Sequence, residues 1–118
     1  MQTVGNFGVG SVVNIAFKYD DNSGFKFRPA VIISFDNVST IVALLKITTH
    51  DVRTEYDMVV SDTQLANLKA GSVIGCNHVM RVSNNYRCKY RGTLCRQDIA
   101  DCSLRYKKAL LNKNLIVS

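Results

Sequence analysis

Long apolar runs are absent from the 118-residue sequence. The longest candidates, residues 29–35 and 41–45, fall far short of the roughly 18 consecutive apolar residues that a membrane helix needs. Residues 1–5 have neither the basic start nor the apolar stretch of a secretory signal. We therefore expect no membrane-spanning segment and a cytoplasmic protein.

Metal-binding sequence patterns are also missing. The four cysteines include no Cys-x-x-Cys pair, and neither His50 nor His78 completes a zinc-binding spacing. Without a secretory signal, buried free thiols are expected rather than disulfides. The sequence predicts no metal site and no cofactor.

Acidic residues are few in comparison with basic ones. Nine Asp and Glu stand against 15 Lys and Arg, which gives a formal net charge of +6. Such a charge favours a polyanionic partner, but it does not choose between nucleic acid and an acidic protein segment. A hydrophobic content of 47% supports a packed core, and the length allows one domain, residues 1–118.

Short apolar or alternating runs, separated by turn residues, predict a mainly β protein. The expected strands are residues 11–17, 30–35, 40–47, 56–60, 72–82 and 86–91. Residues 30–35 are apolar on both faces, which predicts a central strand, and Pro29 suits its first position. Basic residues alternate along residues 86–91, as in a protected edge strand or an RNA-contacting face.

Two helices are expected. Ser61 or Asp62 could cap a short one that carries Leu65 and Leu68 and ends near Gly71. After Cys95 the apolar residues recur at helical spacing through residues 99–110, with an i,i+4 pair of Asp101 and Arg105. The glycines at positions 5, 8 and 10 lack the order of a dinucleotide-binding motif, so residues before the first strand are expected to form a flexible leader.

Three polar clusters remain once the core is assigned. They are Arg28 at the mouth of the central strand, Thr48–Asp51 together with Arg53, and the turn at residues 18–22. Each has an ordinary explanation on its own, as a surface charge, a strand terminator or a solvated loop. Loops held at neighbouring strand ends can nevertheless form a site together.

The order and spacing of these segments resemble the PemK/MazF toxins of bacterial toxin-antitoxin pairs. Residues 10–13 resemble the family's opening strand, residues 27–32 its Arg-Pro strand, and residues 46–50 with Arg53 the Thr-Ser-His loop of one branch. Residues 65–73 and 92–98 resemble two later segments, so the likeness covers about residues 10–111. Departures are Ser11 for an acid, Thr49 for serine, Val52 for proline and Asn67 for glycine.

The resemblance implies an SH3-like β-barrel with a short helix and a C-terminal α-helix, usually as a homodimer. It also implies a metal-independent, sequence-selective endoribonuclease that cleaves single-stranded RNA, such as mRNA, by attack of the 2′-OH, leaving a cyclic phosphate. The family's catalytic arginine and threonine map to Arg28 and Thr48. A cognate acidic antitoxin is the implied protein partner.

The chemistry of these residue types agrees with the implied roles. A fixed guanidinium can stabilise charge on the phosphate, and a threonine hydroxyl can orient it. His50 could assist proton transfer, contact substrate or serve the loop. The expected substrate-binding residues are Lys18, Tyr19, Lys26, Thr49, His50 and Arg53.

Two rival functions use the same barrel. One is a gyrase poison that binds a protein without catalysis; relatives of that kind use an aromatic-bearing C-terminal tail, whereas this sequence has no Trp and ends Asn114-Leu115-Ile116-Val117-Ser118. The other is an RNA-binding module that does not cleave. Cleavage of labelled RNA in the presence of a chelator separates both rivals from the ribonuclease.

Overall fold

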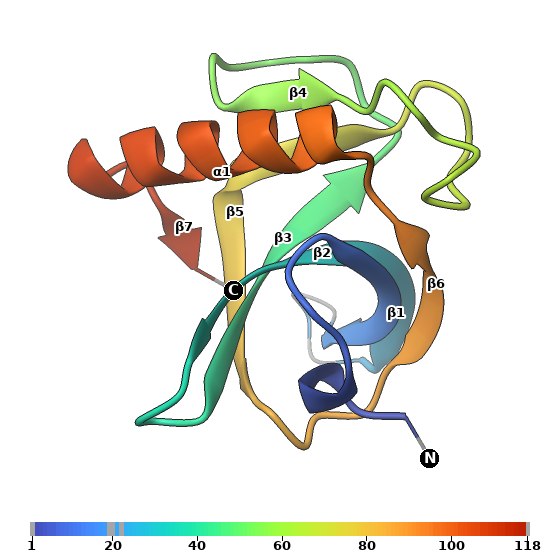
Figure 1. Cartoon of the computed structure of the whole chain (residues 1–118), viewed down its shortest axis with the longest axis vertical. Coiled ribbons are helices and arrows are strands. Elements are labelled where there is room, and N and C mark those ends of the chain that lie inside the picture. The colour runs from blue at the N-terminus through green and yellow to red at the C-terminus, as the bar shows by residue number, and fades with distance from the viewer. Residues whose placement is uncertain (1, 19–20, 22, 118) are drawn as a thin grey trace.

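One strongly curved sheet and one long helix dominate the computed structural model, which describes residues 2–18, 21 and 23–117 (Figure 1). The elements in chain order are η1 (Val4–Asn6), β1 (Ser11–Lys18), β2 (Phe25–Asp36), β3 (Ile41–Thr48), β4 (Asp57–Val59), β5 (Val73–Ser83), β6 (Lys89–Thr93), α1 (Arg96–Leu111) and β7 (Ile116–Val117). The expected mainly β fold with a C-terminal helix is therefore confirmed.

The sheet has the strand order β4-β5-β3-β2-β1-β6, and β7 pairs in parallel with β5. Strands β2 and β3 lie in the middle, as the two-faced apolar pattern predicts. Within the part of the chain that the structure describes, β4 and β6 do not pair with each other, so the barrel is not closed.

The curved sheet separates two hydrophobic clusters. One lies between the sheet and α1 and includes Leu45, Ile74 and Leu94; the other lies on the opposite face and includes Ile15, Ile32 and Leu44. Alternate residues of the same strands enter the two clusters because successive side chains of a strand point to opposite faces.

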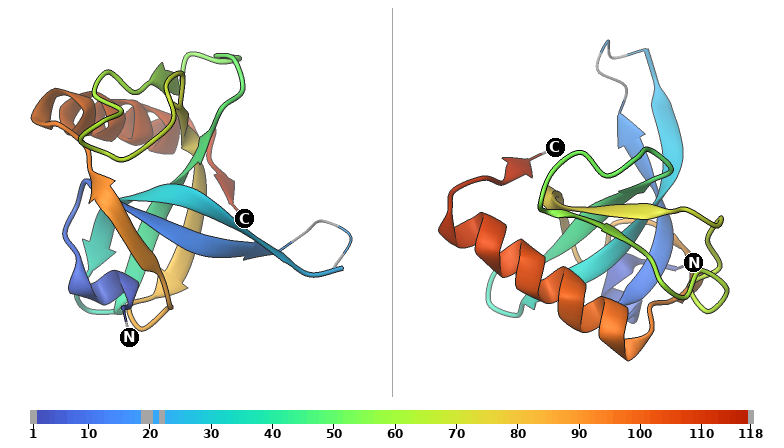
Figure 2. Two further views of the ribbon diagram at one scale, coloured as in Figure 1. Left: turned by 90° about the vertical axis from the view of Figure 1, so that its right-hand side faces the viewer. Right: turned by 90° about the horizontal axis from the view of Figure 1, so that it is seen from above.

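Helix α1 lies across one side of the sheet (Figure 2). Cys102 and Ala109 are fully buried, and the i,i+4 ion pair forms with 2.9 Å between Arg105 Nε and Asp101 Oδ1. Leu110, expected on the buried face, is instead 49% exposed. No helix among residues 2–18, 21 and 23–117 combines the length and apolarity required to cross a membrane.

All four cysteines are free thiols in the structure. Cys76 and Cys102 are buried between β5 and α1, with 3.8 Å between their sulfur atoms. The hydrogen bond to Cys76, together with burial, raises the pKa of the Cys102 thiol, which therefore stays protonated.

The short helix expected after Ser61 does not form. Residues 63–67 form turns, and Asn67 has a φ of 55°, in the left-handed region that a right-handed helix does not use. The buried Asp98 carboxylate of α1 accepts hydrogen bonds from the backbone N–H groups of Ser61 and Asp62 and from the Ser61 hydroxyl. These long-range bonds fix the segment in place without a helix.

The residues before β1 are not a flexible leader. Val4 is fully buried in the cluster that contains Ile15, and its N–H donates to the Tyr86 carbonyl at 2.9 Å. Gly5 donates similarly to Asn84 at 2.8 Å. Pairing with a distant segment and burial of one valine therefore override the glycine-rich local sequence.

Candidate functional site

Arg28 of β2 and Thr48 of β3 lie on neighbouring central strands. The β2–β3 ladder ends at the pair Ala30 and Lys46. Continuing the same register places Arg28 across from Thr48, and the intervening Pro29 has no N–H with which to extend the ladder. The sequence expectation that Pro29 begins the strand is wrong, because β2 starts at Phe25 and pairs along β1.

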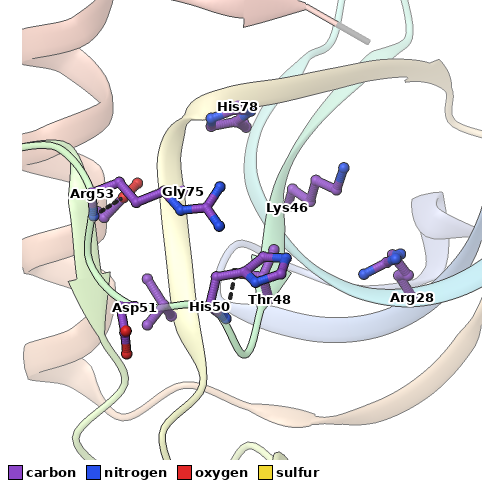
Figure 3. A pocket seen from close by; sticks show the side chains of 10 residues that line it. Arg28, Lys46, Thr48, His50, Asp51, Arg53, Gly75 and His78 are labelled. Atoms are coloured by element: carbon purple, nitrogen blue, oxygen red, sulfur yellow. Dashed lines mark hydrogen bonds between the residues drawn. The ribbon is translucent and has the colours of Figure 1, made fainter. Parts of the chain in front are cut away.

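Both residues line a pocket of about 240 Å³ that we call the His78 pocket (Figure 3). Its lining residues come from β2, β3, β4, β5 and the loop after β3; they are Arg28, Lys46, Thr48, His50, Asp51, Arg53, Asp57, Val73, Gly75 and His78. Cations, carboxylates and imidazoles thus share one open space.

The loop after β3 is held by hydrogen bonds that leave functional groups available. The backbone N–H of His50 donates to Thr48 Oγ1 at 3.4 Å, so the threonine proton can point elsewhere. Asp57 Oδ2 accepts the backbone N–H groups of Arg53 and Thr54 at 2.9 and 3.2 Å. In Figure 3 the Arg53 guanidinium extends toward the pocket.

His78 is the half-buried titratable group of the pocket whose pKa is shifted. Burial lowers the pKa of its imidazole, the Asp57 carboxylate opposes that effect, and the Lys46 ammonium adds to it. The imidazole is therefore neutral at pH 7 and can accept a proton.

A second hollow adjoins the first and shares Arg28 and Thr48 with it. We call it the Arg91 pocket; it has about the same volume, 240 Å³, and is lined by Lys26, Phe27, Arg28, Pro29, Ile47, Thr48, Thr49, Leu68, Lys69, Ser72 and Arg91. None of these is acidic. Arg91 is already engaged, because its guanidinium donates to the Asn67 carbonyl and to Asn14 Oδ1.

Comparisons with known proteins identify the family. A family model described as the PemK-like, MazF-like toxin of type II toxin-antitoxin systems matches residues 9–110. The chain belongs to this family.

Solved structures agree on the fold. MazF in a MazE-MazF crystal structure from Deinococcus radiodurans aligns with a TM-score of 0.69 at 17% identity, over 88% of this chain and 95% of that one. An endoribonuclease in complex with its cognate antitoxin from a mycobacterial species aligns with a TM-score of 0.68 at 14% identity, over 86% and 92%. A sequence search of curated proteins finds no match.

The substrate-binding residues that were expected from the sequence of this PemK/MazF-family toxin lie in different places. Lys26 and Thr49 line the Arg91 pocket, and His50 and Arg53 line the His78 pocket. Lys18, at the exposed end of β1, lines neither. Tyr19 lies outside the described residues.

Four residues that line the two pockets were not predicted as site residues from the sequence. They are Lys46, His78, Phe27 and Lys69. Lys46 and His78 sit in strands whose patterns indicate structure rather than chemistry. Phe27 does carry a signal in the sequence, since it lies between Lys26 and Arg28. The structure shows that its side chain is 74% exposed. Such exposure of a large aromatic ring beside basic residues is typical of a surface that stacks nucleobases.

Proposed function

We propose that this protein is the endoribonuclease toxin of a toxin-antitoxin pair and that it cleaves single-stranded RNA, including mRNA, sequence-selectively and without a metal ion. The supporting observation is that Arg28 and Thr48, from different strands, line the same pockets. In the cleavage, the ribose 2′-oxygen attacks the adjacent phosphorus, the bond to the 5′-oxygen breaks, and a 2′,3′-cyclic phosphate remains.

Arg28 stabilises the charge that builds on the non-bridging phosphate oxygens. Its side chain is half-buried, and among the described residues no carboxylate forms an ion pair with it. The planar guanidinium therefore has its donors available for a phosphate, with little conformational reorganisation. As a permanent cation it is a poor proton acceptor.

Thr48 orients the scissile phosphate. Its oxygen accepts the His50 N–H, which leaves the hydroxyl proton for a phosphate oxygen. Holding that group in line with the attacking oxygen lowers the barrier by removing rotational freedom before reaction.

The two pockets offer a path for RNA on either side of this pair. Lys26, Lys69 and Thr49 can bind phosphates in the Arg91 pocket, and Arg53 can do so in the His78 pocket. Lys18 and Tyr19 remain candidates for nucleotides further along the strand. Single strands fit this arrangement because their unpaired bases can stack on an exposed ring such as Phe27.

The protein partner that we propose is a cognate antitoxin with an acidic segment. One structural relative is described as an endoribonuclease in complex with its cognate antitoxin, and another as a MazE-MazF structure. In this chain an acidic segment would bind to the basic side chains of the same two pockets and would therefore compete with RNA. We propose further that the toxin acts in the cytoplasm as a homodimer, as its family relationship suggests.

The test is cleavage of a long, mixed-sequence RNA transcript in the presence of a chelator. Arg28→Ala is expected to lower the rate by at least about 100-fold, the magnitude seen when a donor to a transition-state oxyanion is removed. Arg96→Ala removes the same charge from the exposed start of α1 and is expected to leave the rate unchanged. The products should end in cyclic phosphate.

The outcomes separate the rival functions. If the wild-type protein binds RNA but leaves it intact, it is a binding module. If it neither binds nor cuts RNA, a protein-binding poison is favoured. Mapping the new ends in the transcript would identify the cleaved sequence.

A further inference from the structure

Strand β5 changes its alignment at the edge of the His78 pocket. Val79 pairs with Leu45 on β3, but the next β3 residue, Lys46, pairs with Gly75. Residues 76–78 therefore bulge out of the β3 ladder, and on the other side His78 pairs with Ile116 of β7. A bulge of this kind redirects a side chain that regular pairing would place elsewhere.

Gly75 makes room for the redirected imidazole. A Cβ built at this glycine would lie 2.9 Å from His78 Cδ2 and 3.4 Å from its Cγ, closer than such atoms normally approach. The ring thus lies directly against the backbone of residue 75. Packing on this side and the bulge together hold the imidazole at the pocket that contains Arg28 and Thr48.

The ring nitrogens of His78 are available. Among residues 2–18, 21 and 23–117, no group forms a hydrogen bond with either ring nitrogen. A structural histidine of the core is normally satisfied by a partner. A half-buried imidazole that faces a pocket without such a partner is suited to a ligand.

We propose that His78 is the general base of the RNA cleavage, a proposal that rests on the ribonuclease function above. As the 2′-oxygen bonds to phosphorus, its proton passes to an imidazole nitrogen; as the bond from phosphorus to the 5′-oxygen breaks, the leaving oxygen takes a proton from water. The imidazolium then returns its proton to solvent.

The charged and titratable groups around the ring support this role. Those that line the same pocket are Arg28 on β2, Lys46 on β3, Asp57 on β4, and His50, Asp51 and Arg53 in the loop after β3. Burial is the main cause that disfavours an imidazolium; the Asp57 carboxylate, which already accepts two backbone N–H groups, opposes this effect, and the Lys46 ammonium adds to it. Burial therefore keeps the base unprotonated near neutral pH.

Two other groups are weaker candidates. His50 is exposed, and its backbone rather than its ring contacts Thr48. Asp51 is an exposed carboxylate, and carboxylates are weaker proton acceptors than imidazole. The half-buried ring, held by the bulge and Gly75, has the more defined position.

The first test compares His78→Gln with His50→Gln in the full chain, using initial cleavage rates on the mixed-sequence transcript from pH 5 to 9. Wild-type activity should fall at acidic pH, with a midpoint below the ordinary histidine value because burial lowers the pKa of His78. His78→Gln should be slower by about 100-fold or more and should lose this acidic limb. His50→Gln should retain the limb, whatever its rate.

The second test separates the base from the acid. Once the cut site is mapped, a substrate with a 5′-bridging sulfur in place of the leaving oxygen departs without protonation. The rate of His78→Gln should remain low with this substrate relative to wild type. If His78→Gln cleaves this substrate as fast as wild type does, His78 protonates the leaving oxygen and is not the base, which would overturn the proposal.

Further outcomes are decisive. If Arg28→Ala abolishes cleavage while His78→Gln keeps the acidic limb, the ribonuclease function stands and the His78 proposal fails. If the wild type does not cleave, the function itself fails. His78→Asn serves as the second variant if the glutamine substitution prevents folding, as judged by circular dichroism.

Discussion

Phe27 and Phe25 provide a matched pair of substitutions for the RNA-binding surface. Both are on β2, both are largely exposed, at 74% and 63%, and they are two residues apart on the same face of the strand. Phe27 lines the Arg91 pocket and also a hollow beside Arg87 and Lys89. Phe25 lines neither, and it pairs with Lys18 near the hairpin turn.

The expected effect of Phe27→Ala follows from this position. A nucleobase that stacks on an aromatic ring gains about 1–3 kcal/mol, so losing the ring should weaken binding by roughly 5- to 150-fold. Phe25→Ala should weaken it by less than about threefold. Neither change should affect stability much, because exposed side chains contribute little to the folded state.

The assay is fluorescence anisotropy with a labelled, mixed-sequence single strand that is 2′-O-methylated and therefore lacks the attacking nucleophile. Salt must be held constant, because phosphate contacts make affinity steeply salt-dependent. Equal losses of affinity in the two variants, or wild-type affinity in Phe27→Ala, would contradict the prediction that a nucleobase stacks on the Phe27 ring, between the Arg91 pocket and the hollow beside Arg87 and Lys89.

Two further predictions concern the elements that hold the site. Asp98→Ala should lower the free energy of unfolding by about 3 kcal/mol, because it removes a buried acceptor of three hydrogen bonds. Asp101→Ala, in a partly exposed ion pair, should lower it by less than about 1 kcal/mol. Equal losses in urea unfolding would contradict this. Gly92→Ala would bring a Cβ within 2.6 Å of the Leu65 carbonyl oxygen and should cost about 1–3 kcal/mol, while Gly8→Ala meets nothing within 4 Å and should be almost neutral in the same measurement.

The periodic parts of the fold were predictable from the sequence, and the exceptions have non-local causes. Alternation and apolar runs predict β1, β2, β3 and β5, and the helical spacing predicts α1, because each of these buries a face that the sequence itself displays. The turns after Ser61 depend instead on Asp98, which is 37 residues away along the chain. Strand β7 is only two residues long and exists because β5 offers it an edge.

The site shows the same division between local and long-range causes. Arg28 and Thr48 could be predicted because they belong to segments that resemble the family. Their shared pocket nevertheless depends on the β2–β3 register and on a ladder that ends at Ala30, the residue after Pro29. His78 is harder to predict from the sequence, since its position depends on a bulge of β5 against β3 and on the space that Gly75 leaves by having no side chain. Neither feature has a periodic signature. A sequence can therefore indicate Arg28 and Thr48 before it indicates His78, because the first two belong to segments that resemble a family, whereas His78 is positioned by irregular pairing inside a strand.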